Sequence, residues 1–313
     1  MTDETIAYTE VKGMNIGTGS AERLVYVGGE YVPENEARIS VFDHVVLYGD
    51  AVFDTACAWG GKVFKLDEHV DRLFESAHAL KIEVPLDKEG VREVVLELMR
   101  RNKLENAYIK IIVTRGVGRM PLMSPYNCRP NLIAFAIPYL SLIDSGVQEE
   151  GLRAGISSMR RIPSECLDSK IKCCNYLNHI LMRMEANEAG LDEAIELDIG
   201  GYVAEAPGYN VFVVKQGVLH TPGENILVGV TRQTVMELAA AEGMETVVGR
   251  LTAFDLYNAD EVFLTSTAGG IFAVREVDGR TIGRGGPGPI TQMLNQKYME
   301  LLESGVQSTP VYP

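Results

Sequence analysis

Two ionisable residues of the 313-residue chain stand where partial burial would make them reactive. Lys172 opens the apolar stretch IKCCNYLNHIL, where desolvation would lower its pKa and free the amine as a nucleophile. Such an amine can form a Schiff base with the aldehyde of a cofactor. Glu205 lies among apolar residues in GYVAEAPGYNVFVV, where a carboxylate is costly unless it meets a positive group such as a protonated pyridine nitrogen. Each residue taken alone is more often a solvated surface group.

Three further segments have the residue types of a phosphate site. Gly229-Val230-Thr231 stands at the start of a helix pattern, where free backbone N–H groups and the positive dipole end attract anions. Thr231 could add a hydroxyl or simply cap the helix. The small residues 265–270 follow a strand pattern and allow close approach of a ligand, although a polar turn would look the same. Arg72 could add a cation, or it could be solvated.

Hydrophobic periodicity predicts the elements that would position these residues. Strands are expected at 24–27, 31–33, 38–42, 51–59, 62–65, 107–114 and 131–140, and helices open at Asp67 and Asp87. Beyond a polar boundary, we expect a strand at 152–159, a helix at 175–189, strands between 193 and 220, a helix at 231–242, β-structure at 261–274 and a helix at 290–303. The predicted organisation is an arm at 1–22, a small α+β domain at 23–140, a linker at 141–151 and a large domain at 152–313.

Composition narrows the classes of function. The net charge of −14 repels phosphate backbones, so we expect no nucleic-acid partner. No apolar run approaches the length of a membrane span, and the acidic start MTDETIAYTE is unlike a secretory signal, so a cytoplasmic location is expected. Five cysteines without a CxxC pair and five histidines without HExxH spacing predict neither a disulfide framework nor a metal site.

Taken in order along the chain, eight segments resemble the class IV, fold-type IV pyridoxal-phosphate enzymes. They are FDHVVLYGDAVFD, HVDRL, VTRGVG, IKCCNYLN, EANEAGLDEAIELDIGGYVAEAPGYNVFVV, GVTR, ADEVFLTSTAGGI and VDGRTIG. The resemblance runs from about Tyr26 to Glu303 and is greatest to branched-chain aminotransferases of the prokaryotic type. It implies an α+β fold with a small α/β N-terminal domain and a larger β-rich pseudo-barrel C-terminal domain. It also implies a homodimer or higher oligomer in which the partner's N-terminal domain helps to close the site.

The resemblance carries roles to particular positions. Lys172 matches the Schiff-base lysine and Glu205 the carboxylate that faces the pyridine nitrogen. Tyr176 matches the tyrosine that hydrogen-bonds the ring 3′-oxygen. The phosphate ligands would be Arg72, Val230, Thr231, Ser266 and Thr267. Residues expected to contact the substrate are Tyr48, Phe53, Tyr108, Arg119, Ala268 and Gly269.

Departures from the family pattern fall where the substrate would lie. Asp54-Thr55-Ala56-Cys57 replaces Glu-Gly-Ile-Arg, Ala204-Glu205-Ala206 replaces Ser-Glu-Gly, and Gly269-Gly270-Ile271 resembles (R)-selective amine transaminases. Arg119 could pair with a substrate carboxylate from its loop, or it could face solvent.

The resemblance therefore predicts transfer of an amino group from a branched-chain-like amino acid, or an (R)-amine, to a 2-keto acid. Three alternatives stay open: a 4-amino-4-deoxychorismate lyase on the same fold, a non-catalytic pyridoxal-phosphate-binding protein, and an acidic interaction module. The last would leave the phosphate-site residues unexplained.

Overall fold

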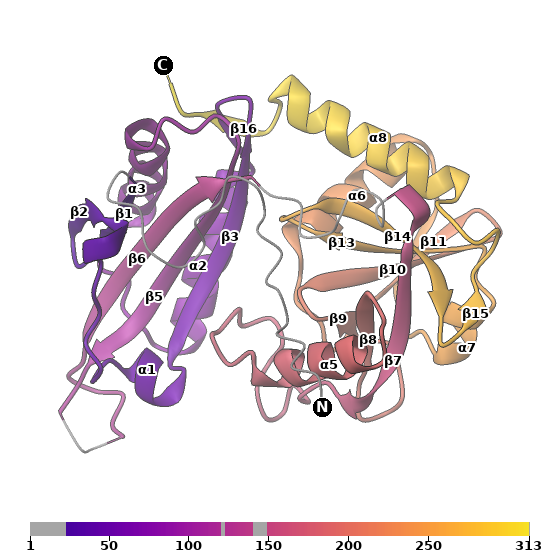
Figure 1. The fold of residues 1–313 in the computed structure, drawn as a ribbon, viewed down its shortest axis with the longest axis horizontal. Helices are drawn as coiled ribbons and strands as arrows, with labels where there is room; N and C mark the ends of the chain where they lie inside the picture. Colours follow the sequence, from indigo (N-terminus) through magenta and orange to yellow (C-terminus); the bar gives the residue numbers. More distant parts are fainter. Residues whose placement is uncertain (1–22, 120–122, 140–148, 313) are drawn as a thin grey trace, which may run out of the picture.

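The computed structural model describes residues 23–119, 123–139 and 149–312, which form two sheets with helices packed on them (Figure 1). The first sheet has the strand order β16-β4-β3-β5-β6-β1-β2, and its neighbouring strands are all antiparallel. Its strands are β1 (Leu24–Val27), β2 (Glu30–Pro33), β3 (Ala51–Trp59), β4 (Lys62–Phe64), β5 (Ala107–Val117), β6 (Arg129–Pro138) and β16 (Ser308–Pro310). The helical elements of this half are η1 (Glu34–Glu36), α1 (His44–Tyr48), α2 (Leu66–Ala79) and α3 (Lys88–Arg101).

The second sheet has nine strands and mixes parallel with antiparallel pairs. Its main path is β12-β11-β10-β13-β14-β7-β8, and β9 and β15 pair with β10 and β14. The strands are β7 (Leu152–Arg160), β8 (Glu193–Leu197), β9 (Glu205–Ala206), β10 (Tyr209–Lys215), β11 (Val218–Pro222), β12 (Thr246–Gly249), β13 (Glu261–Ser266), β14 (Gly270–Val277) and β15 (Arg280–Thr281). The helices of this half are α5 (Leu177–Glu188), α6 (Val230–Ala241), α7 (Ala253–Tyr257) and α8 (Pro289–Ser304).

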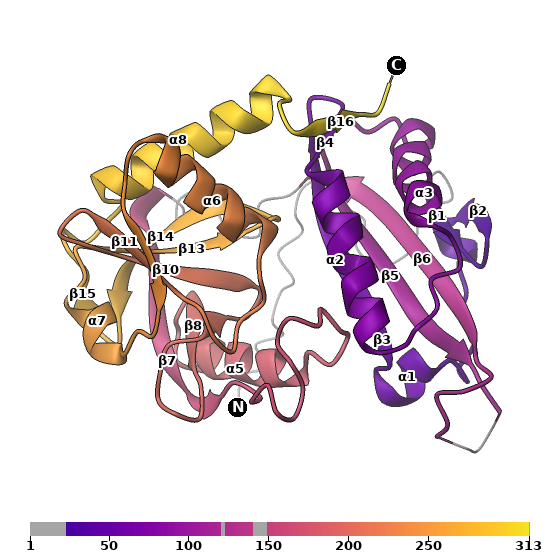
Figure 2. The ribbon, with the colours of Figure 1, turned by 180° about the vertical axis from the view of Figure 1, so that it is seen from behind.

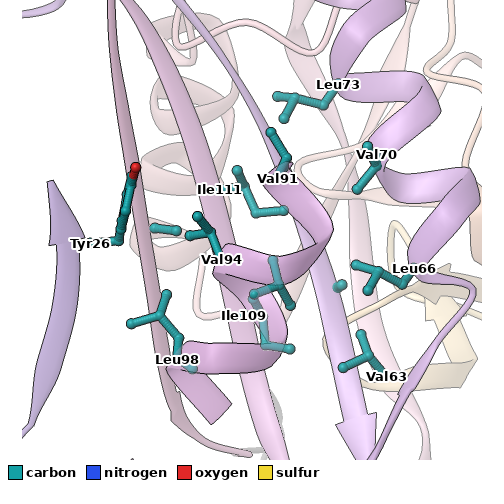
Figure 3. Packing of buried hydrophobic residues seen from close by; sticks show 14 of the residues in the cluster. Tyr26, Val63, Leu66, Val70, Leu73, Val91, Val94, Leu98, Ile109 and Ile111 are labelled. Carbon is teal, nitrogen blue, oxygen red and sulfur yellow. The ribbon is translucent and has the colours of Figure 1, made fainter. Parts of the chain in front are cut away.

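The core of the first half lies between its sheet and helices α2 and α3. Apolar residues recur at helical spacing on both helices and meet alternate residues of β5 (Figure 3). The labelled side chains in this core are Tyr26, Val63, Leu66, Val70, Leu73, Val91, Val94, Leu98, Ile109 and Ile111. Burying a side chain of this size contributes about 1.5–3 kcal/mol, so this core holds β3 and α2 firmly in place.

Strand β3 and helix α2 lie on the side of the first sheet that faces the second half of the chain (Figures 1 and 2). Eight consecutive residues of β3 are buried, because its two faces are both covered. Successive side chains of a strand point to opposite faces. Phe53 and Thr55 therefore point to the space between the halves, and Asp54 points to α2.

Most of the predicted elements are present, with shifts of one to four residues at their ends. The strand predicted at 38–42 is wrong: those residues form no strand, and a short helix, α1, follows. Asp43 caps this helix by accepting a hydrogen bond from the Val45 N–H, and Gly49 ends it with a left-handed φ of 68°. Helix α7 and the return of β16 to pair with β4 were also not predicted.

The predicted arm at 1–22, and residues 141–148 of the predicted linker, lie outside the described residues. The division of the chain into two domains at this linker stays a prediction. No helix in the described part of the chain has the length and apolar character that crossing a bilayer requires.

Candidate active site

A pocket of about 330 Å³ lies between the two halves, and residues from both line it. The first half contributes residues of β3, α2 and β5, and the second contributes the segment before α5, the start of α6 and the end of β13. Of the residues predicted to bind cofactor or substrate, the pocket is lined by Phe53, Arg72, Tyr108, Lys172, Tyr176, Val230, Thr231, Ser266, Thr267 and Ala268. The fold thus gathers positions that are as many as 215 residues apart, from 53 to 268.

Lys172 is held against β3 by backbone hydrogen bonds. The Phe53 N–H donates to the Lys172 carbonyl at 2.9 Å, and the Cys174 N–H donates to the Ala51 carbonyl at 2.9 Å. The Lys172 amine lies 3.2 Å from the Tyr176 hydroxyl and 4.7 Å from the centre of the Phe53 ring. Desolvation, followed by the nearby charge of Arg72, lowers the pKa of Lys172 to about 8. The amine is therefore deprotonated far more readily than an ordinary lysine.

One end of the pocket presents hydrogen-bond donors without an anion to receive them. No side chain caps α6, so the backbone N–H groups of its first turn are free for a ligand. Thr231 and Thr267 bring their hydroxyl oxygens within 3.5 Å of each other, and the buried Ser266 hydroxyl has no partner among the described residues. A Cβ at Gly229 would lie 2.1 Å from Asn210 Oδ1, so only glycine fits before this helix. Such a cluster is suited to a phosphate group.

Arg72 is fixed at the edge of this donor cluster by a buried carboxylate. Its guanidinium makes a bidentate pair with Asp54, at 2.8 and 2.9 Å, and donates to the Val228 carbonyl at 3.1 Å. Asp54 is completely buried, and His69 Nδ1 lies 2.7 Å from it. Burial would raise the pKa of Asp54, but the charge of Arg72 and the hydrogen bond to His69 outweigh it and hold that pKa well below its usual range. Asp54 and His69 thereby orient Arg72.

Glu205 lies in a narrow hollow of about 40 Å³ next to the main pocket, and Lys172 and Tyr176 line both. One carboxylate oxygen accepts from Arg161 Nε at 2.9 Å, and the other accepts from the Leu227 N–H at 2.9 Å. Burial raises the pKa of Glu205, and the charge of Arg161 opposes that rise. A buried carboxylate of this kind can meet a protonated ring nitrogen.

Three predicted substrate residues do not reach this pocket within one chain. Arg119 is exposed and lines a separate hollow with Arg38 and Arg129, while Tyr48 lines another hollow beside Asn175. Gly269 packs against Phe272, since a Cβ there would lie 2.0 Å from the ring. The prediction that these residues contact a substrate in the pocket of their own chain is therefore wrong. Their loops turn away from the Lys172 side of β3.

Comparison with known proteins places the whole assembly. The family model for class IV aminotransferases matches residues 51–277. The chain belongs to the class IV aminotransferases. The sequence-based expectations of this family, of an enzyme that transfers amino groups and of an α+β fold are confirmed.

Curated and solved relatives agree with this membership. A provisionally named branched-chain-amino-acid aminotransferase of Methanocaldococcus jannaschii is 47% identical over 280 residues, which cover 88% of this chain and 96% of that one. A branched-chain amino acid aminotransferase structure from Escherichia coli, 31% identical, superposes with a TM-score of 0.90 over 93% of this chain and all of that one. Another, from T.th. and with pyridoxamine 5′-phosphate, is 35% identical with a TM-score of 0.87, over 94% of this chain and all of that one.

Sequence reasoning missed three side chains of this aminotransferase site. Asp54 and Arg161 are the charge partners of Arg72 and Glu205, and only the folded chain brings them together. Lys110 lines the pocket with its amine 4.2 Å from the centre of the Phe53 ring, and no described carboxylate lies within 4.0 Å of it. Desolvation lowers its pKa. A lysine inside the apolar alternation AYIKIIV was a signal that could have identified it.

Replacing Asp54 with asparagine should destabilise the apoprotein. The change leaves the guanidinium of Arg72 without its buried partner, which costs on the order of 3–5 kcal/mol. Chemical denaturation at pH 7 measures this loss. A carboxyl whose pKa is depressed by folding contributes stability above its unfolded pKa of about 4 and loses it as the pH falls. The difference between the two proteins should therefore shrink below about pH 4.

The exposed pair of Asp71 with Lys88 provides the control. Asp71→Asn should cost no more than about 1 kcal/mol, because solvent screens that pair. Equal losses in the two variants would contradict the assigned role of Asp54.

The low pKa of Lys172 predicts how its reactivity depends on pH. Below about pH 8 the amine is protonated and cannot attack an aldehyde, so covalent capture of pyridoxal phosphate by the apoprotein should accelerate through pH 8 and level off above it. Borohydride trapping followed by mass spectrometry of the peptide measures this rate. A midpoint near 10.5, the value of a solvated lysine, would show that the pocket does not perturb the amine.

Proposed function

We propose that this chain is a pyridoxal-phosphate-dependent aminotransferase that moves an amino group between branched-chain amino acids and a 2-keto acid. The observation that carries this proposal is the position of the Lys172 amine. It lies between a cluster of free donors that suits a phosphate and a buried carboxylate that suits a ring nitrogen, with the Tyr176 hydroxyl at 3.2 Å. Both the matched relatives and the solved neighbours are named as branched-chain enzymes.

Each residue has a distinct task toward the cofactor. The start of α6, Thr231, Thr267 and Ser266 would receive the phosphate, and Arg72 would add its charge. Glu205 would hold a proton on the ring nitrogen, and Tyr176 would donate to the ring oxygen. The bound cofactor supplies an electron sink for the carbon from which a proton is removed. The amine of Lys172 would first hold the cofactor and then, once displaced by substrate, carry that proton from carbon to carbon.

The remaining walls of the pocket suit an aliphatic substrate with a carboxylate. Phe53, Tyr108, Ile112 and Ala268 form an apolar surface that would accept a branched side chain. Lys110 lies among these residues and not among the phosphate donors. We infer that its amine pairs with the distal carboxylate of a dicarboxylic acceptor such as 2-oxoglutarate, which allows one pocket to take both substrate types.

An exposed apolar surface supports assembly of two copies. Leu177 is 70% exposed and, with Ile180 and Met184, forms a stripe on α5 at helical spacing. More exposed apolar residues precede and enter α1, namely Ile39, Val41, Phe42, Val46 and Leu47. Exposed apolar surfaces of this extent mark interaction sites. We infer a homodimer in which the N-terminal half of one copy closes the pocket of the other, which would give Tyr48 and Arg119 a place beside substrate.

Transfer of nitrogen separates this function from its alternatives. With leucine and no keto acid, the holoprotein should convert its bound cofactor to pyridoxamine phosphate and release one equivalent of the keto acid. Adding 2-oxoglutarate should restore the original absorbance. A lyase would release pyruvate from its own substrate without this conversion, and a binding protein would show no change.

Lys172→Ala is the matched variant, and it should abolish the conversion because no other described residue brings an amine to this position. A panel of valine, isoleucine, D-alanine and (R)-amines then ranks the donors. Preference for D-amino acids or (R)-amines over leucine would overturn the assigned substrate class while leaving the transfer reaction in place.

Lys110→Met should change the choice of acceptor. Loss of one charge-assisted contact of about 1.5–3 kcal/mol should lower kcat/KM for 2-oxoglutarate by roughly ten- to a hundredfold, with a much smaller effect on pyruvate, which has no second carboxylate. Lys215→Met, at an exposed site, is the control. Equal losses for both acceptors would show that Lys110 does not bind the distal carboxylate.

A further inference from the structure

Four ionisable side chains form a buried group behind the pocket, which we call the Glu205 cluster. Its members are Arg161, His179, Glu196 and Glu205. They come from different elements: Arg161 directly follows β7, His179 lies on α5, Glu196 on β8 and Glu205 on β9. Glu196 is completely buried, at 0% exposure. A carboxylate in such a place is costly, so its partners decide what it does.

Arg161 is shared unequally between the two carboxylates. Its Nε lies 2.9 Å from Glu205 Oε1 and 3.6 Å from Glu196 Oε2. Glu196 Oε2 is buried and has no hydrogen-bond donor among the described residues. The guanidinium is therefore drawn toward Glu196 by charge without a full hydrogen bond, while it hydrogen-bonds Glu205.

His179 fixes the other oxygen of Glu196. The His179 Nδ1 atom lies 2.5 Å from Glu196 Oε1, and an ionised carboxylate can only accept, so the proton lies on Nδ1. The imidazole is held in turn by the Tyr176 ring, whose centre lies 4.7 Å away. The Tyr176 hydroxyl belongs to the main pocket, so the Glu205 cluster is packed directly against the site.

The ligand atoms of His179, Glu196 and Glu205 lie within 4.8 Å of one another, which is also the spacing of a metal site. The guanidinium of Arg161 contacts both carboxylates and already supplies the positive charge that a cation would bring. The geometry is therefore that of a charge network. A second buried pair, Glu193 with Arg183, lies on the same two elements, β8 and α5, and balances its own charge at 2.5 Å.

The two neighbours of Glu205 act in opposite directions. After burial, which raises the pKa of Glu205, the charge of Arg161 lowers it and the charge of Glu196 raises it again. If Arg161 were left to Glu205 alone, it would neutralise the carboxylate that is needed to attract a proton to a ring nitrogen. Glu196 offsets this neutralisation.

We propose that Glu196 and His179 are positioning residues that preserve the proton affinity of Glu205 toward the cofactor's ring nitrogen. Glu196 does so by sharing the charge of Arg161, and His179 does so by fixing Glu196. The inference rests on the proposed function, because it requires a nitrogen heterocycle opposite Glu205.

Cofactor binding to the apoprotein tests this inference without measuring catalysis. The dissociation constants of pyridoxal phosphate and of its 1-deaza analogue, which has carbon in place of the ring nitrogen, are compared in the parent and in Glu196→Gln. The parent should prefer pyridoxal phosphate. In the variant this preference should fall on the order of fivefold, and the affinity for the analogue should hold, because only the nitrogen senses Glu205. Glu196→Asp withdraws the charge from Arg161 and should shift the preference the same way, which provides a second variant if glutamine prevents folding.

Two matched variants separate this effect from a loss of packing. Glu193→Gln neutralises a buried glutamate on the same strand that does not contact Arg161, so the preference should be unchanged. His179→Asn keeps an N–H donor for Glu196 and removes any positive charge, so the preference should hold or rise. Equal weakening for both cofactors in Glu196→Gln, an unchanged preference, or a fall in His179→Asn would each overturn the inference. Failure of the parent to bind pyridoxal phosphate would instead refute the proposed function.

Discussion

The pair of backbone hydrogen bonds between β3 and the Lys172 segment is the constraint on which the site depends. Through the Phe53 N–H to the Lys172 carbonyl and the Cys174 N–H to the Ala51 carbonyl, a segment of the second half is held along the strand that borders the first. Each bond is ordinary in strength. Their consequence is geometric, because the reactive amine is held on the most firmly packed strand of the first sheet and not on a free loop.

Alternation along β3 then divides the work of the site between two faces. Phe53 and Thr55 face the pocket, while Asp54, between them, is buried toward α2 and holds Arg72 and His69. A strand buried on both faces can carry a charged residue only when a partner compensates it. The position of Arg72 at the phosphate end is thus a result of how β3 packs on α2.

The local charge of the pocket is opposite to that of the whole protein. The chain carries a net charge of −14, yet Arg72, Lys110 and Lys172 converge on one pocket. Desolvation lowers the pKa of both lysines, so neither is a solvated surface cation. The acidic groups near the site are already engaged, Asp54 with Arg72 and Glu205 with Arg161. Anionic groups of a ligand therefore meet positive charge that the protein itself does not neutralise.

The sequence by itself determined the family, most of the elements and the positions of Lys172, Tyr176 and Glu205, because these are carried by local motifs and by hydrophobic periodicity. It did not show that 38–42 forms no strand, since the Asp43 cap and Gly49 stop compete with a weak β pattern. It also missed Lys110 and the partners Asp54, Arg161, Glu196 and His179. Only the tertiary structure decided these, and it placed Arg119, Tyr48 and Gly269 outside the pocket of their own chain. The physical reason is that pairing between buried charges depends on distances of a few ångströms between segments far apart in the chain, which residue types and local spacing do not encode.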